Sequence, residues 1–201
     1  MLNDTHKVQK LEGPVLVPAT SSEIQRFVSR PLFSVRHTAT AACEFQTHSH
    51  SSFVVTVVLA GRFAATIGER TFDLSAGDSA LTNVGQLHAA SASAVEFVSV
   101  GVAPLLVNGL VTEIGLTRTT ADIVFGKSVE RDETLTAMAR AIATEIKDER
   151  FGHAEMLDAL VRQLVIHLLR CHLTVRMPGP IELSRAGPVD RRLRRAIEFM
   201  H

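Results

Sequence analysis

The first half of the chain is a series of short apolar runs separated by glycine-containing turns, and this pattern constrains the fold more than any other feature. Between Leu32 and Val102 the runs are FSVRHTA, FVVTVVL, FAATI, SALTNV and VEFVSVGV, and the turns are AGR, IGER and SAGD. β-branched and aliphatic residues favour strands. Closely spaced strands with glycine turns are typical of a sandwich or a barrel. We therefore expect a β-structure here.

Three histidines fall within this region. His48 and His50 are separated by one residue, so on an extended strand both side chains point to the same face. If the strand continues, that face also carries Ser52, Val54 and Thr56, while the opposite face carries Phe53, Val55, Val57 and Leu59. Two imidazoles at this spacing can reach one metal ion, and a third ligand must then come from another strand.

The spacing around these histidines resembles the two sequence motifs of the cupin family. The first motif reads His48, His50, three residues, Val54 where the family often has glutamate, and six residues to Gly61. The second reads Gly77, five residues, Asn83 where proline is usual, Val84, Gly85, two residues and His88. The resemblance implies a double-stranded β-helix, or jelly-roll barrel, in which His48, His50 and His88 point inside.

Two roles are open for the three histidines. Together they are a sufficient ligand set for a single divalent transition metal, such as zinc, nickel or iron, with positions left for water or a ligand. Val54 in place of glutamate removes a fourth ligand, which argues against metal-dependent catalysis. Without a metal, the imidazoles hydrogen-bond a small molecule, each other, or the polar residues Ser52, Thr56 and Asn83.

We expect the barrel to hold an effector in a pocket lined by His48, His50, Val54, Thr56, Leu81 and His88. Such an interior fits a sugar, an aromatic acid or an aliphatic chain. The chain has no Trp and no Tyr, the aromatic residues most used to stack sugars, which argues against a carbohydrate. The remaining histidines, including His6, His37, His153, His167 and His172, lack a paired spacing, and we assign them no chemistry.

Helical periodicity begins after the β-rich region. Apolar residues recur at helical spacing from Asp132 to Arg150, Gly152 interrupts the pattern, and a second helix is predicted from Ala154 to His172. The apolar face of the second helix is broad. It either covers the barrel within one chain or lies between two subunits. We expect a homodimer that packs through Leu160, Leu164, Val165 and Leu168.

The last residues predict a linker and the beginning of another element. Residues 177–188 are rich in Pro and Gly, and the segment PVDRRLRRAIEFMH that follows is amphipathic at helical spacing. A short amphipathic helix cannot bury its own apolar face, so we expect the natural protein to continue beyond His201. From about Phe33 to the end, this order of elements resembles the N-terminal region of AraC-type transcription regulators.

The resemblance implies a sensor and dimerisation domain. A small-molecule effector in the barrel would control promoter binding by an attached helix-turn-helix domain, and DNA would be contacted only through that downstream domain. The expected fold class is α+β, a cupin barrel followed by a helical pair. The expected segments are a tail and entry segment over 1–30, the barrel over 31–130, a helical dimerisation segment over 131–175, and a linker with the start of a DNA-binding domain over 176–201.

A small metal-dependent cupin enzyme, a dioxygenase or an isomerase using His48, His50 and His88, is the alternative function. We expect a sensor and not an enzyme. Nucleophilic catalysis has no support, because neither cysteine has a local partner and no GxSxG motif occurs. The 21 basic and 21 acidic residues balance to zero net charge, so no global charge favours nucleic acid or a membrane. The absence of CxxC pairs and of a long apolar segment predicts a cytoplasmic protein without a membrane partner.

Overall fold

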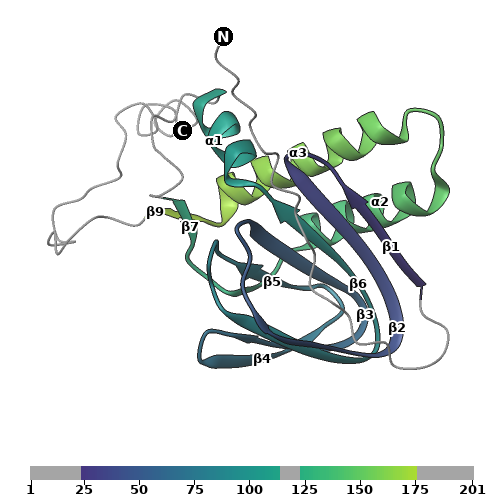
Figure 1. The fold of residues 1–201 in the computed structure, drawn as a ribbon, viewed down its shortest axis with the longest axis vertical. Helices are drawn as coiled ribbons and strands as arrows, with labels where there is room; N and C mark the ends of the chain where they lie inside the picture. Colours follow the sequence, from purple (N-terminus) through teal and green to yellow (C-terminus); the bar gives the residue numbers. More distant parts are fainter. Residues whose placement is uncertain (1–23, 114–122, 176–201) are drawn as a thin grey trace, which may run out of the picture.

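A seven-stranded antiparallel sheet organises the fold, and the computed structural model describes residues 24–113 and 123–175. Its strands are β1 (Ile24–Ser29), β2 (Phe33–His48), β3 (Phe53–Ile67), β4 (Arg70–Ser75), β5 (Asp78–Thr82), β6 (His88–Val102) and β8 (Val129–Arg131). They lie in the order β1-β2-β6-β3-β5-β8, and β4 pairs with the second half of β3. Two short strands, β7 (Ile123–Phe125) and β9 (Leu173–Val175), form a separate antiparallel pair (Figure 1).

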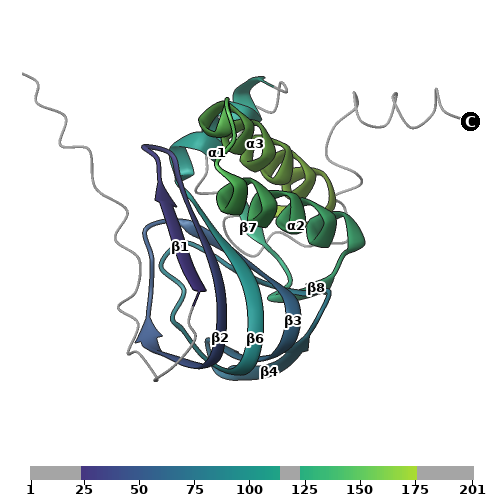
Figure 2. The ribbon, with the colours of Figure 1, turned by 90° about the vertical axis from the view of Figure 1, so that its right-hand side faces the viewer.

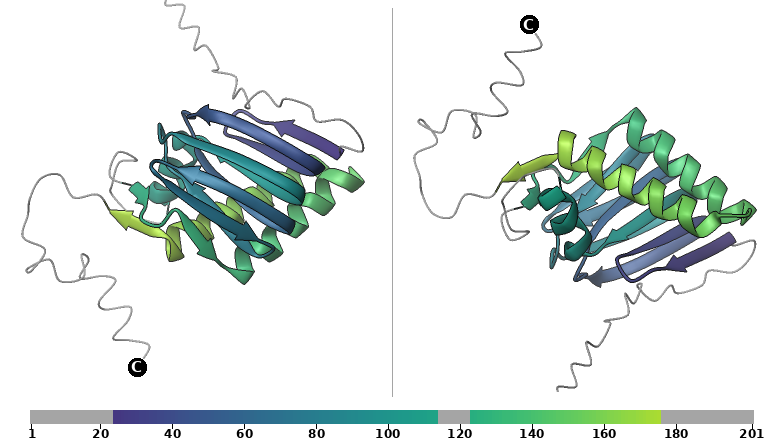
Figure 3. Two further views of the ribbon diagram at one scale, coloured as in Figure 1. Left: turned by 90° about the horizontal axis from the view of Figure 1, so that it is seen from below. Right: turned by 90° about the horizontal axis from the view of Figure 1, so that it is seen from above.

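Helices cover one face of this sheet. α2 (Glu133–Asp148) and α3 (His153–Cys171) lie side by side across it, and α1 (Pro104–Glu113) lies at its end (Figures 2 and 3). The two helices predicted over Asp132–Arg150 and Ala154–His172 are confirmed to within two residues at each end. The predicted α+β class, a β-barrel followed by a helical pair, is confirmed as well.

The alternation predicted for β3 decides which side chains meet the helices. Phe53, Val55, Val57 and Leu59 belong to the core between the sheet and the helices, together with residues such as Leu135 of α2 and Leu157 of α3. Val54 and Thr56 point to the opposite, concave face, where they line a cavity. The strand therefore separates an apolar core from a pocket, as its period of two requires.

A bend in β3 and β6 turns the sheet around that cavity. The register between the two strands shifts on both sides of Ala60. Gly61 has φ of +78°, and a Cβ at this position would overlap the carbonyl of Ala94, so only glycine fits. Beyond the bend, Phe63 of β3 packs edge-on against Phe97 of β6, with ring centroids 5.2 Å apart. Both rings line the cavity, on the far side of the glycine of the first motif.

Leu81 corrects the predicted pocket lining. It is 1% exposed, and it belongs to the core against the helices rather than to the cavity wall. β5 pairs with β3 so that Leu81 lies opposite Val55, while Ala80 and Thr82 lie opposite Thr56 and Val54. Directly opposed residues share a face of the sheet. Ala80 and Thr82 therefore line the cavity in its place.

The surface predicted for a homodimer is wrong for three of its four residues. Leu164, Val165 and Leu168 are at most 2% exposed within this one chain, because α3 uses its broad apolar face against α2 and the sheet. Leu160 is partly buried against the same core. A side chain already buried within the chain offers no area to a second subunit. The breadth of this face is explained by the single-chain core.

Two elements lie within the predicted segments. β1 lies within the tail and entry segment predicted over 1–30, and it pairs with β2 along its whole length. α1 lies inside the segment assigned to the barrel. The linker and basic helix expected over 176–201 lie outside the described residues. None of the helices in residues 24–113 and 123–175 combines the length and apolarity needed to cross a membrane.

Candidate metal and effector site

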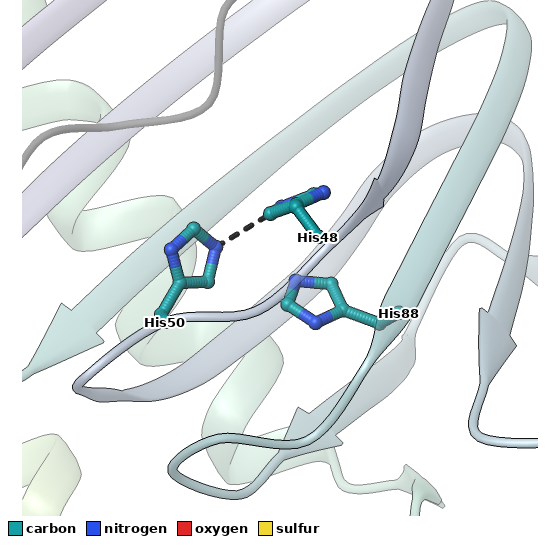
Figure 4. A group of neighbouring side chains, drawn as sticks. All are labelled: His48, His50 and His88. Carbon is teal, nitrogen blue, oxygen red and sulfur yellow. Dashed lines mark hydrogen bonds between the residues drawn. The ribbon is translucent and has the colours of Figure 1, made fainter.

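His48, His50 and His88 meet at one end of the sheet. His48 is the last residue of β2, His88 is the first residue of β6, and the two are paired in the strand register. His50 lies in the loop between β2 and β3, so it reaches the group from the loop rather than from a continued strand. One ligand atom from each imidazole lies within 4.8 Å of the other two, and the three rings lie next to one another with their planes inclined (Figure 4).

Hydrogen bonds orient two of the three imidazoles for metal binding. His48 Nδ1 donates to the Gln46 carbonyl at 2.6 Å, and His88 Nδ1 donates to the Gln86 carbonyl at 2.9 Å. A carbonyl can only accept, so in the neutral rings the Nε2 atoms carry lone pairs. His50 Nε2 lies 3.1 Å from His48 Nε2 and donates to it. Metal-binding histidines commonly have this arrangement, with the outer nitrogen held by a carbonyl.

The electrostatics of the cluster favour the neutral forms of His50 and His88. Burial, followed by the charges of His88, His48 and Arg36, lowers the pKa of His50 to about 4. Burial also lowers the pKa of His88; the hydrogen bond to Gln86 opposes this, and His48 adds to it. Neutral imidazole is the form that binds a metal. At pH 7 the site therefore presents ligating nitrogens.

The three histidines open into a cavity of about 500 Å³. Val54 and Thr56, both predicted for the pocket, line it, and Thr56 Oγ1 hydrogen-bonds Ser99 Oγ across the sheet at 2.6 Å. Four phenylalanines contribute apolar surface: Phe27, Phe45, Phe63 and Phe97. Cavities of this size and mixed character hold small organic molecules.

Arg36 is the pocket residue that matters most among those that sequence reasoning missed. It lies on β2 and lines the cavity together with Ser34, and its guanidinium lies 5.7 Å from the centre of the Phe27 ring. Phe33 and Val35, which alternate with Ser34 and Arg36 along β2, face the helices. Strand alternation in FSVRHTA was the signal that could have placed Ser34 and Arg36 on the pocket face.

The donor set fits a divalent transition metal. Three imidazole nitrogens suit zinc, nickel or iron, and the carbonyl bonds of His48 and His88 hold the rings in place. Val54 lines the cavity where a glutamate would supply a fourth ligand. The protein thus offers three ligands, and a bound metal would have further positions open to a small molecule.

The comparisons with known proteins point to one family. The model of the AraC-like ligand binding domain matches residues 34–165. The sequence search of curated proteins found no match.

Solved structures with a similar fold include regulators and cupins. The AraC-like transcriptional activator CuxR is 14% identical, with 83% of this chain and 60% of that chain covered and a TM-score of 0.47. A conserved Streptococcus pyogenes protein of unknown function is 20% identical, covering 51% of this chain and 98% of its own, with a TM-score of 0.40. A cupin superfamily protein from Desulfitobacterium hafniense is 11% identical, covering 43% and 84%, with a TM-score of 0.39.

Proposed function

Because the chain belongs to the family of AraC-like ligand binding domains, we propose that it is the effector-binding and dimerisation domain of an AraC-type transcription regulator. A small molecule binds in the cavity and changes how an attached helix-turn-helix domain sits on promoter DNA in the cytoplasm. The cavity beside the three histidines is the observation that carries this proposal, since it supplies a pocket of ligand size within the matched residues.

The charge of the cavity wall favours an anionic effector. Arg36 and three imidazoles line the cavity, and no Asp or Glu occurs among the described residues that line it. A carboxylate is the group that an arginine fork binds best. The phenylalanine rings suit an apolar or aromatic body. The effector class is therefore a small carboxylic acid with an apolar part.

A metal on His48, His50 and His88 would strengthen this recognition. A divalent ion would supply a positive charge and open coordination positions for a carboxylate oxygen. Arg36 lies on the same cavity and acts on the charge of His50. Metal and guanidinium would together select an acid over its neutral amide.

Asn83 connects the cavity wall to the segment that leaves α3. Thr82 lines the cavity, and the next residue, Asn83, bonds both backbone groups of Phe125 in β7, accepting from its N–H at 2.8 Å and donating to its carbonyl at 3.1 Å. β7 pairs with β9, which directly follows α3. A shift of the cavity wall on effector binding would reach β9 by this route.

Dimerisation is also part of the proposal, since regulators of paired DNA half-sites are commonly two-fold symmetric. The buried residues of α3 cannot form the contact, so it must use other surfaces. Light scattering over a range of protein concentrations tests this, and a monomer at every concentration would remove dimerisation from the proposal.

A panel of small carboxylic acids and their matching amides, each with and without zinc, tests the sensor function by thermal unfolding. We expect at least one acid to raise the melting temperature and its amide to leave it unchanged. If the amides raised the melting temperature as much as the acids, the result would contradict an anionic effector. Binding of none of the compounds, with or without metal, would count against a sensor of carboxylic acids.

A metal-dependent enzyme remains the second candidate, favoured by the three histidines with open positions. The same stabilising acid serves as the probe. Its recovery unchanged after incubation with the zinc-loaded and iron-loaded protein supports the sensor, and its conversion supports the enzyme.

A further inference from the structure

A second group of side chains that could hold a metal ion lies outside the cavity lining. Asp132, His167 and His172 each offer one ligand atom, and these atoms lie within 4.8 Å of one another. Asp132 Oδ2 accepts hydrogen bonds from His167 Nε2 at 2.7 Å and from His172 Nε2 at 2.9 Å. The three side chains are between 11% and 18% exposed. The group is thus shielded but reachable from solvent.

Separate elements bring these residues together. Asp132 follows β8 and caps the N-terminus of α2, His167 lies in the last turns of α3, and His172 is the residue that caps the end of α3. The cap orients the carboxylate, because Asp132 Oδ1 accepts from the amides of Thr134 and Leu135. This leaves Oδ2 alone directed at the two imidazoles. Such orientation of a ligand by backbone donors is typical of built metal sites.

We propose that Asp132, His167 and His172 form a second binding site for a divalent transition metal, with zinc as the ion of choice. Two imidazole nitrogens and one carboxylate oxygen are a frequent ligand set for zinc, and water completes the shell. The ion takes the place of the two protons that now lie between Nε2 and Oδ2. Each proton moves to the Nδ1 atom of its own ring, so the imidazoles remain neutral.

The distances require only a small adjustment. Tetrahedral zinc with ligand bonds of about 2.0–2.2 Å separates its ligand atoms by about 3.3 Å. The two Nε2–Oδ2 distances of 2.7 and 2.9 Å are therefore about half an ångström short of that separation. A small rotation of the His167 and His172 imidazoles would supply this change without moving the helices. Cys171 Sγ lies 3.8 Å from Nδ1 of His167, where it would accept a hydrogen bond from the relocated Nδ1–H.

The site joins the beginning of α2 to the end of α3. His172 directly precedes β9, which pairs with β7. A metal ion would fix the end of α3 against α2 at the point where the chain passes to β9. The site is independent of the effector cavity, so it can exist whether or not the proposed sensor function is correct.

The test measures zinc binding in the full 201-residue chain after the first cluster is removed. The background variant is His48→Gln/His50→Gln, which leaves only His88 in the cavity. Equilibrium dialysis against zinc, followed by metal analysis, is expected to give about one tightly bound zinc ion per chain. Adding His172→Gln is expected to lower the affinity for this zinc ion more than tenfold. Adding His153→Gln, a histidine of α3 outside the cluster, is the matched control and keeps the zinc.

Asp132→Asn gives a second reading that preserves the helix cap, since asparagine also caps helices well. In the same background it is expected to weaken zinc binding at least tenfold while circular dichroism shows the native fold. Zinc is also expected to raise the melting temperature of the background variant but not of the His172→Gln variant. A folded background variant without tightly bound zinc, or one whose zinc binding survives both His172→Gln and Asp132→Asn, would overturn the proposal.

Discussion

His37 Nε2 donates a hydrogen bond to Glu96 Oε1 at 2.9 Å, and this pair joins β2 to β6 beneath α2. His37 is fully buried, and Lys147 of α2 lies 3.2 Å from the same glutamate oxygen. No chemistry was assigned to His37 from the sequence, and the structure gives this buried side chain an ion-pair partner. One carboxylate thus connects two strands and a helix on the side of the sheet away from the cavity.

Replacement of Glu96 by Gln is expected to lower the free energy of unfolding by about 1 kcal/mol, because the charge that pairs with Lys147 and strengthens the bond from His37 is lost. The hydrogen bond from His37, first, and the interactions with Lys147 hold the pKa of Glu96 below its usual value against the effect of burial. The pKa of Glu96 is lower in the native state than in the unfolded state. The wild type should therefore lose this stability as the pH falls from the unfolded pKa through the native pKa.

Urea unfolding at pH 7 and at pH 4 measures both effects. Glu130→Gln is the control, since Glu130 pairs with the exposed Lys127 and its loss should change stability by less than about 0.5 kcal/mol. Equal destabilisation by the two substitutions would show that the His37–Glu96 pair adds nothing.

The lowered pKa of His50 predicts that the free energy of unfolding decreases at acidic pH. Its pKa falls from 6.5 to about 4 on folding, chiefly through burial, so below pH 6.5 the unfolded chain binds a proton that the native chain resists. Stability of the metal-free protein should decrease as the pH falls from 6.5 towards 4. His50→Gln should flatten this decrease, and His153→Gln should leave it as in the wild type. Urea midpoints at pH 7.5 and 5 measure it, and an unchanged slope in His50→Gln would contradict the prediction.

Arg36 is expected to determine the affinity for acids. Arg36→Gln removes the guanidinium from the cavity wall and should weaken binding of a stabilising acid by about 10- to 100-fold, the value of one charge-assisted hydrogen bond. Arg62→Gln, an exposed arginine on β3 that does not line the cavity, is the control. Titration calorimetry compares them, and equal affinity for wild type and Arg36→Gln would exclude Arg36 from recognition.

Val54→Glu is expected to restore a fourth ligand beside the histidines. Zinc affinity should rise about tenfold or more, because a carboxylate adds charge and a donor atom at the cavity wall. Without metal the variant should be less stable than the wild type, since the carboxylate is partly desolvated. Competition with a coloured chelator measures the affinity. Val54→Gln controls for side-chain size, and an equal gain from Val54→Gln would refute a ligand role.

Asn83→Ala is expected to loosen the connection between the cavity and β7. Loss of both bonds to the Phe125 backbone should destabilise the protein by about 1–3 kcal/mol, because Phe125 is buried and its polar groups lose their partner. Hydrogen exchange in residues 123–125 and 173–175 should accelerate, while acids still bind. Thr66→Ala, which removes an exposed threonine pair, is the control. Unchanged hydrogen exchange in Asn83→Ala would contradict the proposed connection from the cavity to β7 and β9.

Asn83 also shows how a departure from a motif can be explained. It stands where proline is usual in the second cupin motif, and its side chain makes two bonds to β7 that proline could not make. The sequence showed the departure, but β7 is 40 residues further along the chain. Only the folded chain shows what the asparagine contacts.

The sequence by itself determined local periodicity. Alternation on β3 predicted that Val55 faces a core and Thr56 a pocket, helical spacing predicted α2 and α3, and motif spacing brought His88 to His48 and His50. Each of these depends on the positions of side chains relative to near neighbours on one element, or on a spacing shared with a family. Such patterns can be identified from the order of residues alone.

The tertiary structure decided which elements meet. Leu81 takes the core side because β5 pairs with β3 in a particular register, and α3 uses its broad apolar face within the chain rather than on a partner. Asp132 meets His167 and His172 because α2 and α3 lie antiparallel, with the start of one beside the end of the other. Periodicity fixes the face on which a side chain lies, but strand register and helix packing fix what covers that face.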